Sequence, residues 1–552
     1  MSTRQVARGV AGAAALIASL TLLARIAGFG RTLVFTNAVG AGTTGGTYTA
    51  ANNVPNIVFE VVAGGALAGL VVPMLAGGIA AGNRDQVRKT ASALLTWALL
   101  VLIPLAVAVA LAAEPIARLL LGSGDDAKVA LATRFLLVFA PQVVLYGVGI
   151  VLAGILQAHR RFTAPAIAPL LSSLVVAAVY LAFALMHGSR DVVSLSTPAE
   201  LVLGIGTTLG VVALSLSLLL PVHRLRLGLR PTVRFPVGAG VRVRRLAAAG
   251  VVTLAGQQLV AAVAIRLANN GAPVDTQVVY FAGMTLFLVP WAALAVPLAT
   301  SAYPGLAERA ATGDDEGFRR ALAPVVVTVL VACLAAAGVL AAVAGPMARV
   351  FFLHEPAATV LATRNTILAF APGLVGYGLV AVLTRALYAR GSWKAPTACV
   401  AGGWVLAVVV DVVLAGVLPA ADRGVALAAG HTLGVTVAGA GLLVVVVREV
   451  GRGAVAGLAR SGSAALVGAV LGGAAGAALV PILGGGPAQG LSAVPAVAVG
   501  LAAGATVLVI VAAVIMATAR GPMAATLRAL RAGEGSRVGA PEDLEGLEVH
   551  GG

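Results

Sequence analysis

Four polar side chains interrupt an apolar stretch that is long enough to cross a membrane. The segment from Asn52 to Leu67 reads NNVPNIVFEVVAGGAL and carries Asn52, Asn53, Asn56 and Glu60. Residues spaced by four lie on one face of a helix, so Asn52, Asn56 and Glu60 form a stripe with Asn53 beside it. A charge at the bilayer centre costs at least ~2.5 kcal/mol, which predicts that the stripe lines a polar cavity. A polar clamp between two helices is the alternative.

Three arginines could supply an anion-binding site in such a cavity. Arg25 and Arg31 lie toward the end of the first apolar stretch, and Arg266 lies in the seventh. Guanidinium groups bind phosphate oxygens two at a time, so these side chains would attract a pyrophosphate, and any of them could pair with Glu60. For Arg25 and Arg31 the alternative is a helix-end side chain that reaches toward the lipid head groups.

One carboxylate lies deep in the second half of the chain, at Asp411 in LAVVVDVVLAG. In hydrocarbon this group would be protonated or paired, with Arg385 as the candidate partner. A carboxylate that exchanges a proton or binds Na⁺ is also a means of coupling transport to an ion gradient, and the membrane potential is another source of energy. We find no catalytic constellation and no metal-ligand spacing, so we expect neither an enzyme nor a cofactor.

The composition excludes a soluble protein. Of 552 residues, 60% are hydrophobic and 11% are charged, and the mean hydropathy is +1.01. At ~20 apolar residues per crossing, the sequence holds about fourteen candidate spans. We therefore predict an all-α polytopic membrane protein.

The net charge of +16 follows the membrane topology. Basic residues cluster on alternate loops, whereas the opposite loops balance them with acids. The clusters are Arg84, Arg88 and Lys89; His159, Arg160 and Arg161; Arg309, Arg319 and Arg320; Arg390 and Lys394; and Arg448 and Arg452. This positive-inside pattern predicts that both termini are cytoplasmic, and it argues against nucleic-acid binding.

The chain contains an internal repeat. The segment FAPQVVLYGVGIVLAGILQAHRRFTAP at Phe139 matches FAPGLVGYGLVAVLTRALYARGSWKAP at Phe370, with an offset of 231 residues. We predict an N-lobe (1–222), a basic cytoplasmic linker (223–246), a C-lobe (247–452), two further spans (453–518) and a disordered tail (519–552). Two six-helix lobes in the same orientation around a central cavity are typical of transporters. Pro55, Pro290 and Pro297 are the candidate hinges.

Three segments carry a resemblance to a known family: SLTLLARIAGFGRTLVFTNAVGAG, NNVPNIVFEVVAGGALAGLVVPMLAG and ALYARGSWKAPT. They resemble the MurJ/MviN family of lipid II flippases, in the multidrug/oligosaccharidyl-lipid/polysaccharide exporter superfamily. The resemblance implies two lobes in a V shape, and two C-terminal helices that line a groove for the lipid tail. It implies that undecaprenyl-pyrophosphate-linked disaccharide-pentapeptide moves from the inner to the outer leaflet for cell-wall synthesis.

The resemblance also assigns roles to residues. Arg25 and Arg31 fall on the arginines of an R-x-x-G-F-x-R segment that belongs to the substrate cavity, and Asp411 falls where some members hold a coupling cation. The chain departs from the family at other positions. It has Gly46 where many members have an Asp shortly before span two, Phe59 and Glu60 where they have an arginine pair, and Met284 and Thr285 where they have an arginine in span eight.

The expected location is the cytoplasmic membrane of a GC-rich bacterium. The expected partners are lipid II and membrane lipids, with cell-wall synthesis or division proteins as further candidates. Three alternatives stay open at this point: a flippase for another polyprenyl-linked oligosaccharide, a cation-coupled drug exporter of the same fold, and a membrane scaffold for cell-wall enzymes.

Overall fold

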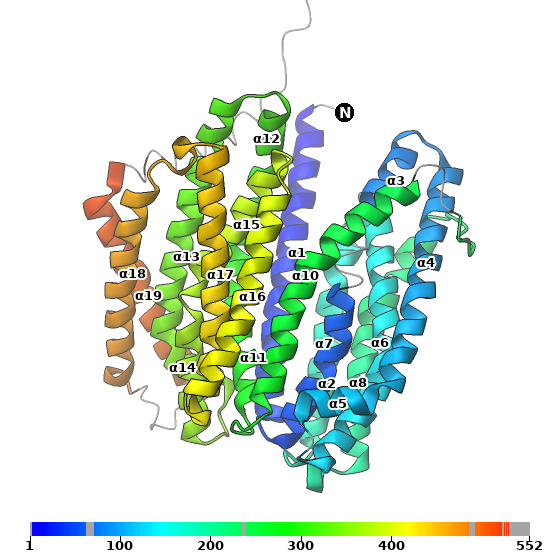
Figure 1. Ribbon diagram of the computed structural model, residues 1–552, viewed down its shortest axis with the longest axis vertical. Coiled ribbons are helices and arrows are strands. Elements are labelled where there is room, and N and C mark those ends of the chain that lie inside the picture. Colours follow the sequence, from blue (N-terminus) through cyan, green and yellow to red (C-terminus); the bar gives the residue numbers. More distant parts are fainter. Residues whose placement is uncertain are drawn as a thin grey trace, which may run out of the picture.

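The computed structural model describes residues 3–61, 71–122, 124–234, 239–484 and 492–521, together with residues 524, 526 and 528. It describes their side chains except those of 3–18, 73 and 239–253. Within these ranges every regular element is a helix. Figure 1 shows long helices that run in the same general direction, and we call the side on which α1 begins the upper side. Most of the predicted disordered tail lies outside the described residues.

The N-lobe is formed by the first part of the chain. Its elements are α1 (Thr3–Ala38), α2 (Thr43–Phe59), α3 (Val71–Ala80), α4 (Arg84–Leu111), α5 (Ala113–Leu121), α6 (Asp126–Ala158), α7 (Thr163–Leu185), η2 (Val192–Ser194), α8 (Thr197–Leu216) and α9 (Leu219–His223). Helix α1 packs along α7, and α6 lies at the centre of the lobe, in contact with α2, α4 and α8.

The C-lobe and two further helices follow. Their elements are α10 (Ala239–Ala268), α11 (Thr276–Pro290), η3 (Trp291–Ala295), α12 (Val296–Ala311), α13 (Asp315–Phe351), α14 (Ala357–Phe370), α15 (Gly373–Ala389), α16 (Lys394–Val417), η4 (Ala420–Asp422), α17 (Arg423–Glu449), η5 (Arg452–Val455), α18 (Leu458–Ile482) and α19 (Ala493–Thr518). Helices α18 and α19 pack on α13 at the outer edge of this lobe (Figure 1).

The first residues of the helices keep the offset of the predicted repeat. Helices α4 and α13, α6 and α14, and α7 and α16 begin at residues that are 231 positions apart. The two halves differ in their breaks, however. The first half interrupts its third crossing at Ala112, whereas α13 continues without a break. The second half instead bends by 42° between α14 and α15, whereas the corresponding α6 is one continuous helix.

The predicted all-helical membrane fold is confirmed. Among the described residues, 10 helices are long and apolar enough to span a membrane, or 11 if the bent α14–α15 pair is counted as one span. The count of fourteen stays a prediction. The basic clusters of the sequence lie at the α3–α4, α6–α7, α12–α13, α15–α16 and α17–α18 junctions, all on the upper side (Figure 1).

The buried cores show where the lobes meet. The upper half of the N-lobe has a core of its own, which includes Leu75, Leu94 and Leu152. In the lower half, residues such as Tyr48 and Phe135 share one core with C-lobe residues such as Phe287. The lobes are therefore joined by apolar packing on the lower side, whereas on the upper side the backbones of α3 and α4 are set apart from those of α12 and α15, with α10 crossing between them (Figure 1).

Small residues let α18 approach its neighbours closely. A Cβ added to Gly472 would lie 3.0 Å from the Cα of Val507 on α19, and one added to Gly338 of α13 would lie 2.8 Å from the Ala469 carbonyl oxygen. Helix association in lipid depends on such close packing, because burial from water contributes little there. Larger residues at these positions would force the helices apart.

We predict that Gly472→Val lowers the thermal stability of the purified protein, because its branched side chain has no room against Val507. Overpacking of this kind typically costs about 1–3 kcal/mol. The matched control is Gly402→Val on α16, since a Cβ there has open space within 4 Å. Melting curves in detergent should separate the two variants, and equal melting temperatures would contradict the packing described here.

Candidate functional site

A polar cavity lies between the two lobes. It has a volume of about 180 Å³, and its walls come from α1, α2 and α7 of the N-lobe and from α11 of the C-lobe. Four residues singled out in the sequence line it together, namely Arg31, Asn52, Asn53 and Asn56. The three asparagines of the predicted polar stripe therefore face a cavity at the lobe interface, whereas Glu60 is not part of its lining.

Arg31 is the cation of this cavity. Its guanidinium makes no ion pair or hydrogen bond to any residue that the structure describes, although it lies within electrostatic range of the Tyr48, Tyr146 and Tyr180 phenols. An unpaired cation inside a membrane protein is costly unless water or an anionic ligand solvates it. The side chain is thus positioned to bind an anion from the cavity.

Three other polar side chains of the wall each donate a hydrogen bond to their own helix. Asn53 Nδ2 donates to the Thr49 carbonyl oxygen at 2.7 Å, and Asn56 Nδ2 donates to the Asn52 carbonyl oxygen at 3.0 Å. The Thr285 hydroxyl donates to the Phe281 carbonyl oxygen at 2.8 Å. The amide and hydroxyl oxygens remain as acceptors. The wall can therefore accept hydrogen bonds from a ligand rich in hydroxyl or amide N–H groups, beside one cation that binds its anionic part.

Glu60 lies outside the lining of this cavity. It directly follows α2, in π-helical backbone, and is half-buried, within electrostatic range of Tyr146 of the N-lobe and Tyr377 of the C-lobe. The structure gives it no ion pair with Arg25, Arg31 or Arg266, all of which are described. None of these three arginines pairs with Glu60, so the predicted cation partner is wrong.

Arg266 lies at the lower end of α10, away from Arg31. A Cβ added to Gly122 would be 3.4 Å from Arg266 Nη1, which places this guanidinium against the end of α5 in the other lobe. Nη1 is buried and has no hydrogen-bond partner among the described residues. The structure thus separates Arg266 from the cavity and puts it at a second contact between the lobes.

Arg25 is exposed on α1 and does not line the cavity. It precedes Arg31 by six residues, which is about 9 Å along the helix and roughly 120° around it. Its neighbours Leu22 and Ile26 are also exposed. The two arginines of the shared sequence segment therefore lie in different surroundings.

Asp411 is fully buried in the C-lobe, between α16 and α17. Neither carboxylate oxygen has a hydrogen-bond partner among the described residues, and Oδ1 lies against Gly430, where an added Cβ would be 1.9 Å away. The candidate partner Arg385 donates instead to the Ala381 carbonyl oxygen at 2.7 Å. The predicted Asp411–Arg385 pair is therefore wrong.

The candidate hinge residues lie at irregular positions of two helices. Pro55 is buried inside α2, and Pro290 and Pro297 flank the five-residue π-helical segment η3. The ring of Trp291 stacks on Tyr377 at 4.5 Å, and its Nε1 donates to the Tyr377 carbonyl oxygen at 3.2 Å. Such π-helical segments often occur at functional sites.

A polar network closes the lower side of the lobe interface. Arg190, in the loop after α7, forms an ion pair with Glu355, in the loop after α13, with 2.8 Å between Nη1 and Oε1. The same Glu355 oxygen accepts from the Ala41 amide at 3.0 Å, and Arg190 Nη2 donates to the Asn37 carbonyl oxygen at 3.1 Å. The Asn37 side chain bonds the Val350 carbonyl oxygen and the Leu353 amide. We call Asn37, Ala41, Arg190 and Glu355 the lower latch.

Gly40 gives the latch room to form. Its φ is +83°, and an added Cβ would lie 2.8 Å from Glu355 Oε1 and 2.9 Å from Arg190 Nε. Glycine adopts this conformation without strain and leaves space for both side chains. Sequence reasoning missed the latch, because its charged residues come from loops that are 165 positions apart. The glycine after an apolar helix was the local signal for a turn, but nothing in the sequence indicated the partner.

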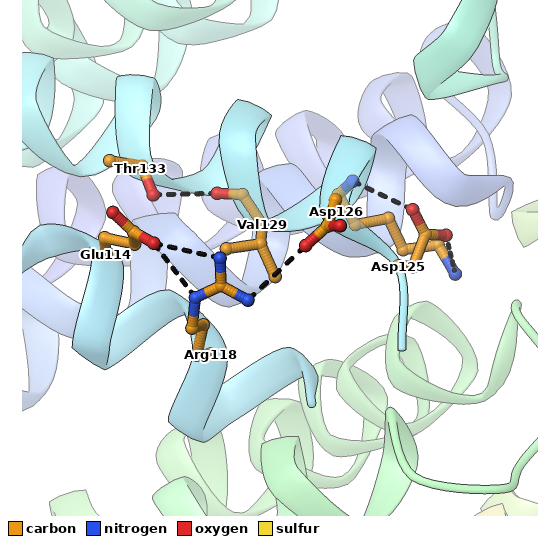
Figure 2. Close-up of polar contacts among 7 residues, drawn as sticks. Glu114, Arg118, Asp125, Asp126, Val129 and Thr133 are labelled. Carbon is orange, nitrogen blue, oxygen red and sulfur yellow. Dashed lines mark hydrogen bonds and ion pairs between the residues drawn. The ribbon is translucent and has the colours of Figure 1, made fainter. Parts of the chain in front are cut away.

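A separate ion cluster organises the turn between α5 and α6 (Figure 2). Arg118 binds Glu114 at 2.9 Å and Asp126 at 3.4 Å, and Asp125 caps α6 by accepting from the Lys128 amide at 3.1 Å. The hydrogen bond to Glu114 raises the pKa of Arg118, so this side chain stays charged. All of these residues belong to the N-lobe, so the cluster stabilises the lobe and does not join it to the other.

The family follows from comparison with known sequences. The model of the family described as lipid II flippase MurJ matches residues 35–485 of the chain. The chain belongs to the lipid II flippase MurJ family. A probable lipid II flippase MurJ of Rhizobium meliloti (strain 1021) is 29% identical over 181 residues, which are 32% of this chain and 34% of that protein. The chain thus aligns with about a third of the length of this curated MurJ relative.

Solved structures share the fold. A lipid II flippase MurJ in an inward closed conformation superposes with a TM-score of 0.69 at 16% identity, covering 91% of this chain and 99% of that one. An inward-facing multidrug resistance MATE family transporter of the MOP superfamily superposes with a TM-score of 0.63 at 15% identity, covering 78% and 94%. The two-lobed transporter fold is therefore common to this MurJ family member and to the MATE transporters.

We predict that Glu355→Gln weakens closure of the lower side, because it removes the negative charge that pairs with the Arg190 guanidinium, while the amide oxygen can still accept from the Ala41 amide. Loss of the charge from one partly exposed ion pair, worth about 1 kcal/mol, would change the ratio of open to closed molecules by roughly fivefold. The measurement is the distance distribution between spin labels on the lower loops of the two lobes.

Glu200→Gln is the matched control for this prediction. Glu200 pairs with Arg134 at 2.6 Å, and its side chain is 15% exposed compared with 13% for Glu355, but both partners belong to the N-lobe. The distance distribution should stay as in the parent protein. An equal shift in both variants would mean that the latch does not control closure.

Proposed function

We propose that this protein is a flippase for lipid II, and that it moves the lipid-linked peptidoglycan precursor from the inner to the outer leaflet of the bacterial cytoplasmic membrane. The single observation that carries the proposal is the unpaired Arg31 in a polar cavity between two lobes. A pyrophosphate is a ligand that a guanidinium binds in two-point fashion. The family membership supports the same substrate.

The cavity would hold only part of the substrate in this conformation. Its volume of about 180 Å³ is below the ~300–1,000 Å³ typical of pockets for drug-sized ligands. The pyrophosphate would bind Arg31, and sugar or peptide groups would donate to the oxygens of Asn52, Asn53 and Asn56. The rest of the head group would extend toward the upper side, and the prenyl tail would stay in lipid.

Alternating access would then follow from rocking of the lobes. We assign the upper side to the cytoplasm, because the basic clusters lie there, and both termini with it. The closed latch and the shared lower core support an inward-facing state. Outward opening would break the Arg190–Glu355 pair and bend the helices near Pro55, Pro290 and Pro297. No covalent bond is made or broken.

Asp411 is our candidate for energy coupling. A buried carboxylate without a hydrogen-bond partner favours a bound proton or Na⁺ over the bare charge. Binding and release of that cation would bias the C-lobe toward one conformation. The membrane potential is the alternative source of energy.

Two other functions share this fold. The similarity to multidrug transporters favours a drug exporter as the second candidate, but the cation and amide groups of the cavity suit an anionic, hydroxyl-rich head group better than an apolar drug. A flippase for another polyprenyl-linked oligosaccharide would use the same groups. We propose cell-wall synthesis or division proteins as partners only because the proposed substrate is a cell-wall precursor.

We predict that Arg31→Ala abolishes rescue of a bacterium depleted of its own lipid II flippase, because the pyrophosphate loses its cation. Loss of hydrogen bonds to a charged group costs about 1.5–3 kcal/mol, or roughly ten- to a hundredfold in binding. Arg31→Lys should rescue partly, since an ammonium cannot bind in two-point fashion. The measurement is survival together with surface labelling of lipid II.

The control for this experiment is Arg118→Ala, which removes an exposed arginine of the N-lobe that lies outside the cavity. Membrane expression of each variant is measured by blotting. Full rescue by Arg31→Ala would refute the role of the cavity. Failure of the parent protein at normal expression would instead point to another polyprenyl-linked glycan.

We predict that Asp411→Asn uncouples transport from the ion gradient, since the amide has the shape of the acid but cannot exchange a proton or hold Na⁺. The assay is lipid II flipping in proteoliposomes with an imposed pH or Na⁺ gradient. The parent protein should respond to one of the gradients and the variant to neither. Asp422→Asn, on the lower loop between α16 and α17, should behave like the parent. A response retained by Asp411→Asn would exclude this residue as the coupling site.

A further inference from the structure

The segment that leaves the N-lobe lies as a strap along the outside of α4. We define the strap as residues 224–234. Its backbone amides at Arg230 and Thr232 donate to the hydroxyls of Ser92 and Thr96, each at 3.0 Å. Trp97 Nε1 donates to the Val233 carbonyl oxygen at 2.9 Å. Leucines at alternate positions of the strap pack on the N-lobe core, as expected of an extended chain: Leu225, Leu227 and Leu229. The strap is thus fixed to the surface of the N-lobe.

A basic pocket opens between the strap and the start of α4. Its volume is about 660 Å³. Four cationic side chains line it, two from α4 and two from the strap: Arg88, Lys89, Arg230 and Arg234. Asp85 is the one acid of the lining, and it pairs with both Arg88 and Lys89. The strap arginines have no carboxylate partner within the described ranges, so the pocket carries an excess of positive charge.

An apolar groove continues from this pocket down α4. Its volume is about 350 Å³, and the two hollows share Ser92, Arg230 and Pro231. Below them the groove follows the lipid-facing side of α4 past Leu99 and Ile103 to Pro104. The distance from residue 92 to residue 104 is about 18 Å at the rise of an α-helix. One leaflet contributes roughly 15 Å of hydrocarbon, so the groove has the length of one leaflet.

From this arrangement we propose that the strap and α4 form a binding site for an anionic phospholipid of the upper leaflet. Its phosphate would bind Arg230 and Arg234 in the basic pocket, and one acyl chain would lie in the groove beside Leu99 and Ile103. The charge of the pocket selects an anionic head group over a zwitterionic one. The groove is too short for an extended polyprenyl tail, which distinguishes this occupant from the transported substrate.

The site would connect the lipid to the movement of the lobes. The strap is the last described part of the chain before α10, the first helix of the C-lobe. A lipid bound by both α4 and the strap would hold the strap, which connects the N-lobe to α10, against the N-lobe. Loss of the lipid would free the strap. This lipid site would exist whatever substrate the cavity carries, because it is formed only by the position and charges of the two hollows.

The test is lipid binding by the purified full-length chain, measured by native mass spectrometry after titration with phosphatidylglycerol. Phosphatidylcholine and inorganic phosphate are titrated in parallel. The parent protein should retain phosphatidylglycerol in preference to phosphatidylcholine, and inorganic phosphate should not displace it. The double variant R230A/R234A should bind phosphatidylglycerol roughly thirtyfold more weakly. It loses two cations, and each cation near an anionic lipid typically strengthens binding about fivefold.

R160A/R161A is the matched control, because it removes the same charge from exposed residues on the same side of the N-lobe. It should bind like the parent. A further variant, Leu99→Trp, fills the groove without changing the charge and should weaken binding of the diacyl lipid. Equal losses in R160A/R161A and R230A/R234A would overturn the site in favour of general surface charge. Displacement by inorganic phosphate would overturn the lipid in favour of a soluble anion.

Discussion

The low tolerance of hydrocarbon for unpaired polar groups is the constraint on which the rest of this structure depends. Thr49, Asn53, Asn56 and Thr285 meet it locally, because each bonds a carbonyl oxygen four residues earlier on its own helix. Their helices therefore stay intact while oxygen atoms face the cavity. Arg31 has no such local solution, since its guanidinium finds no protein partner among the described residues. The placement of one uncompensated cation at the junction of two lobes gives the cavity the charge that the proposed anionic substrate requires.

The same constraint explains why the closed side of the interface is built from two different kinds of contact. Apolar packing in the lower half joins the lobes without directional bonds, as between Phe29 and Phe351, whose ring centroids are 5.7 Å apart. The Arg190–Glu355 pair lies beyond that packing, in loops where water can replace each bond as it breaks. Breaking the Arg190–Glu355 pair in these loops therefore costs less free energy than separating the same charges in hydrocarbon. An interface with its ion pair in the membrane core would lack this property.

The sequence allowed much of the fold to be predicted, because hydropathy and the 231-residue offset depend on residues along single helices. The polar stripe was predictable for the same reason, and the structure brings Asn52, Asn53 and Asn56 together with Arg31. The partners of Glu60 and Asp411 were not, since they depend on how separate helices rotate about their axes. Arg385 illustrates this: it lies in the expected helix but bonds its own backbone. The latch was beyond prediction, because loops distant in sequence create it.

The differences between the two halves show how a duplicated sequence gains a joint. Pro115 and Pro346 are equivalent in the repeat, yet only the first accompanies a break, at Ala112. Helix α13 is held by α18 and α19 along its length, which keeps it continuous through its proline, whereas the first half has no such pair of neighbours. The freed segment α5 turns to meet α10, and Gly122 at its end lies against Arg266 of the other lobe. A local helix break in one half therefore creates the surface that the second half contacts, so the asymmetry itself contributes to the interface between the lobes.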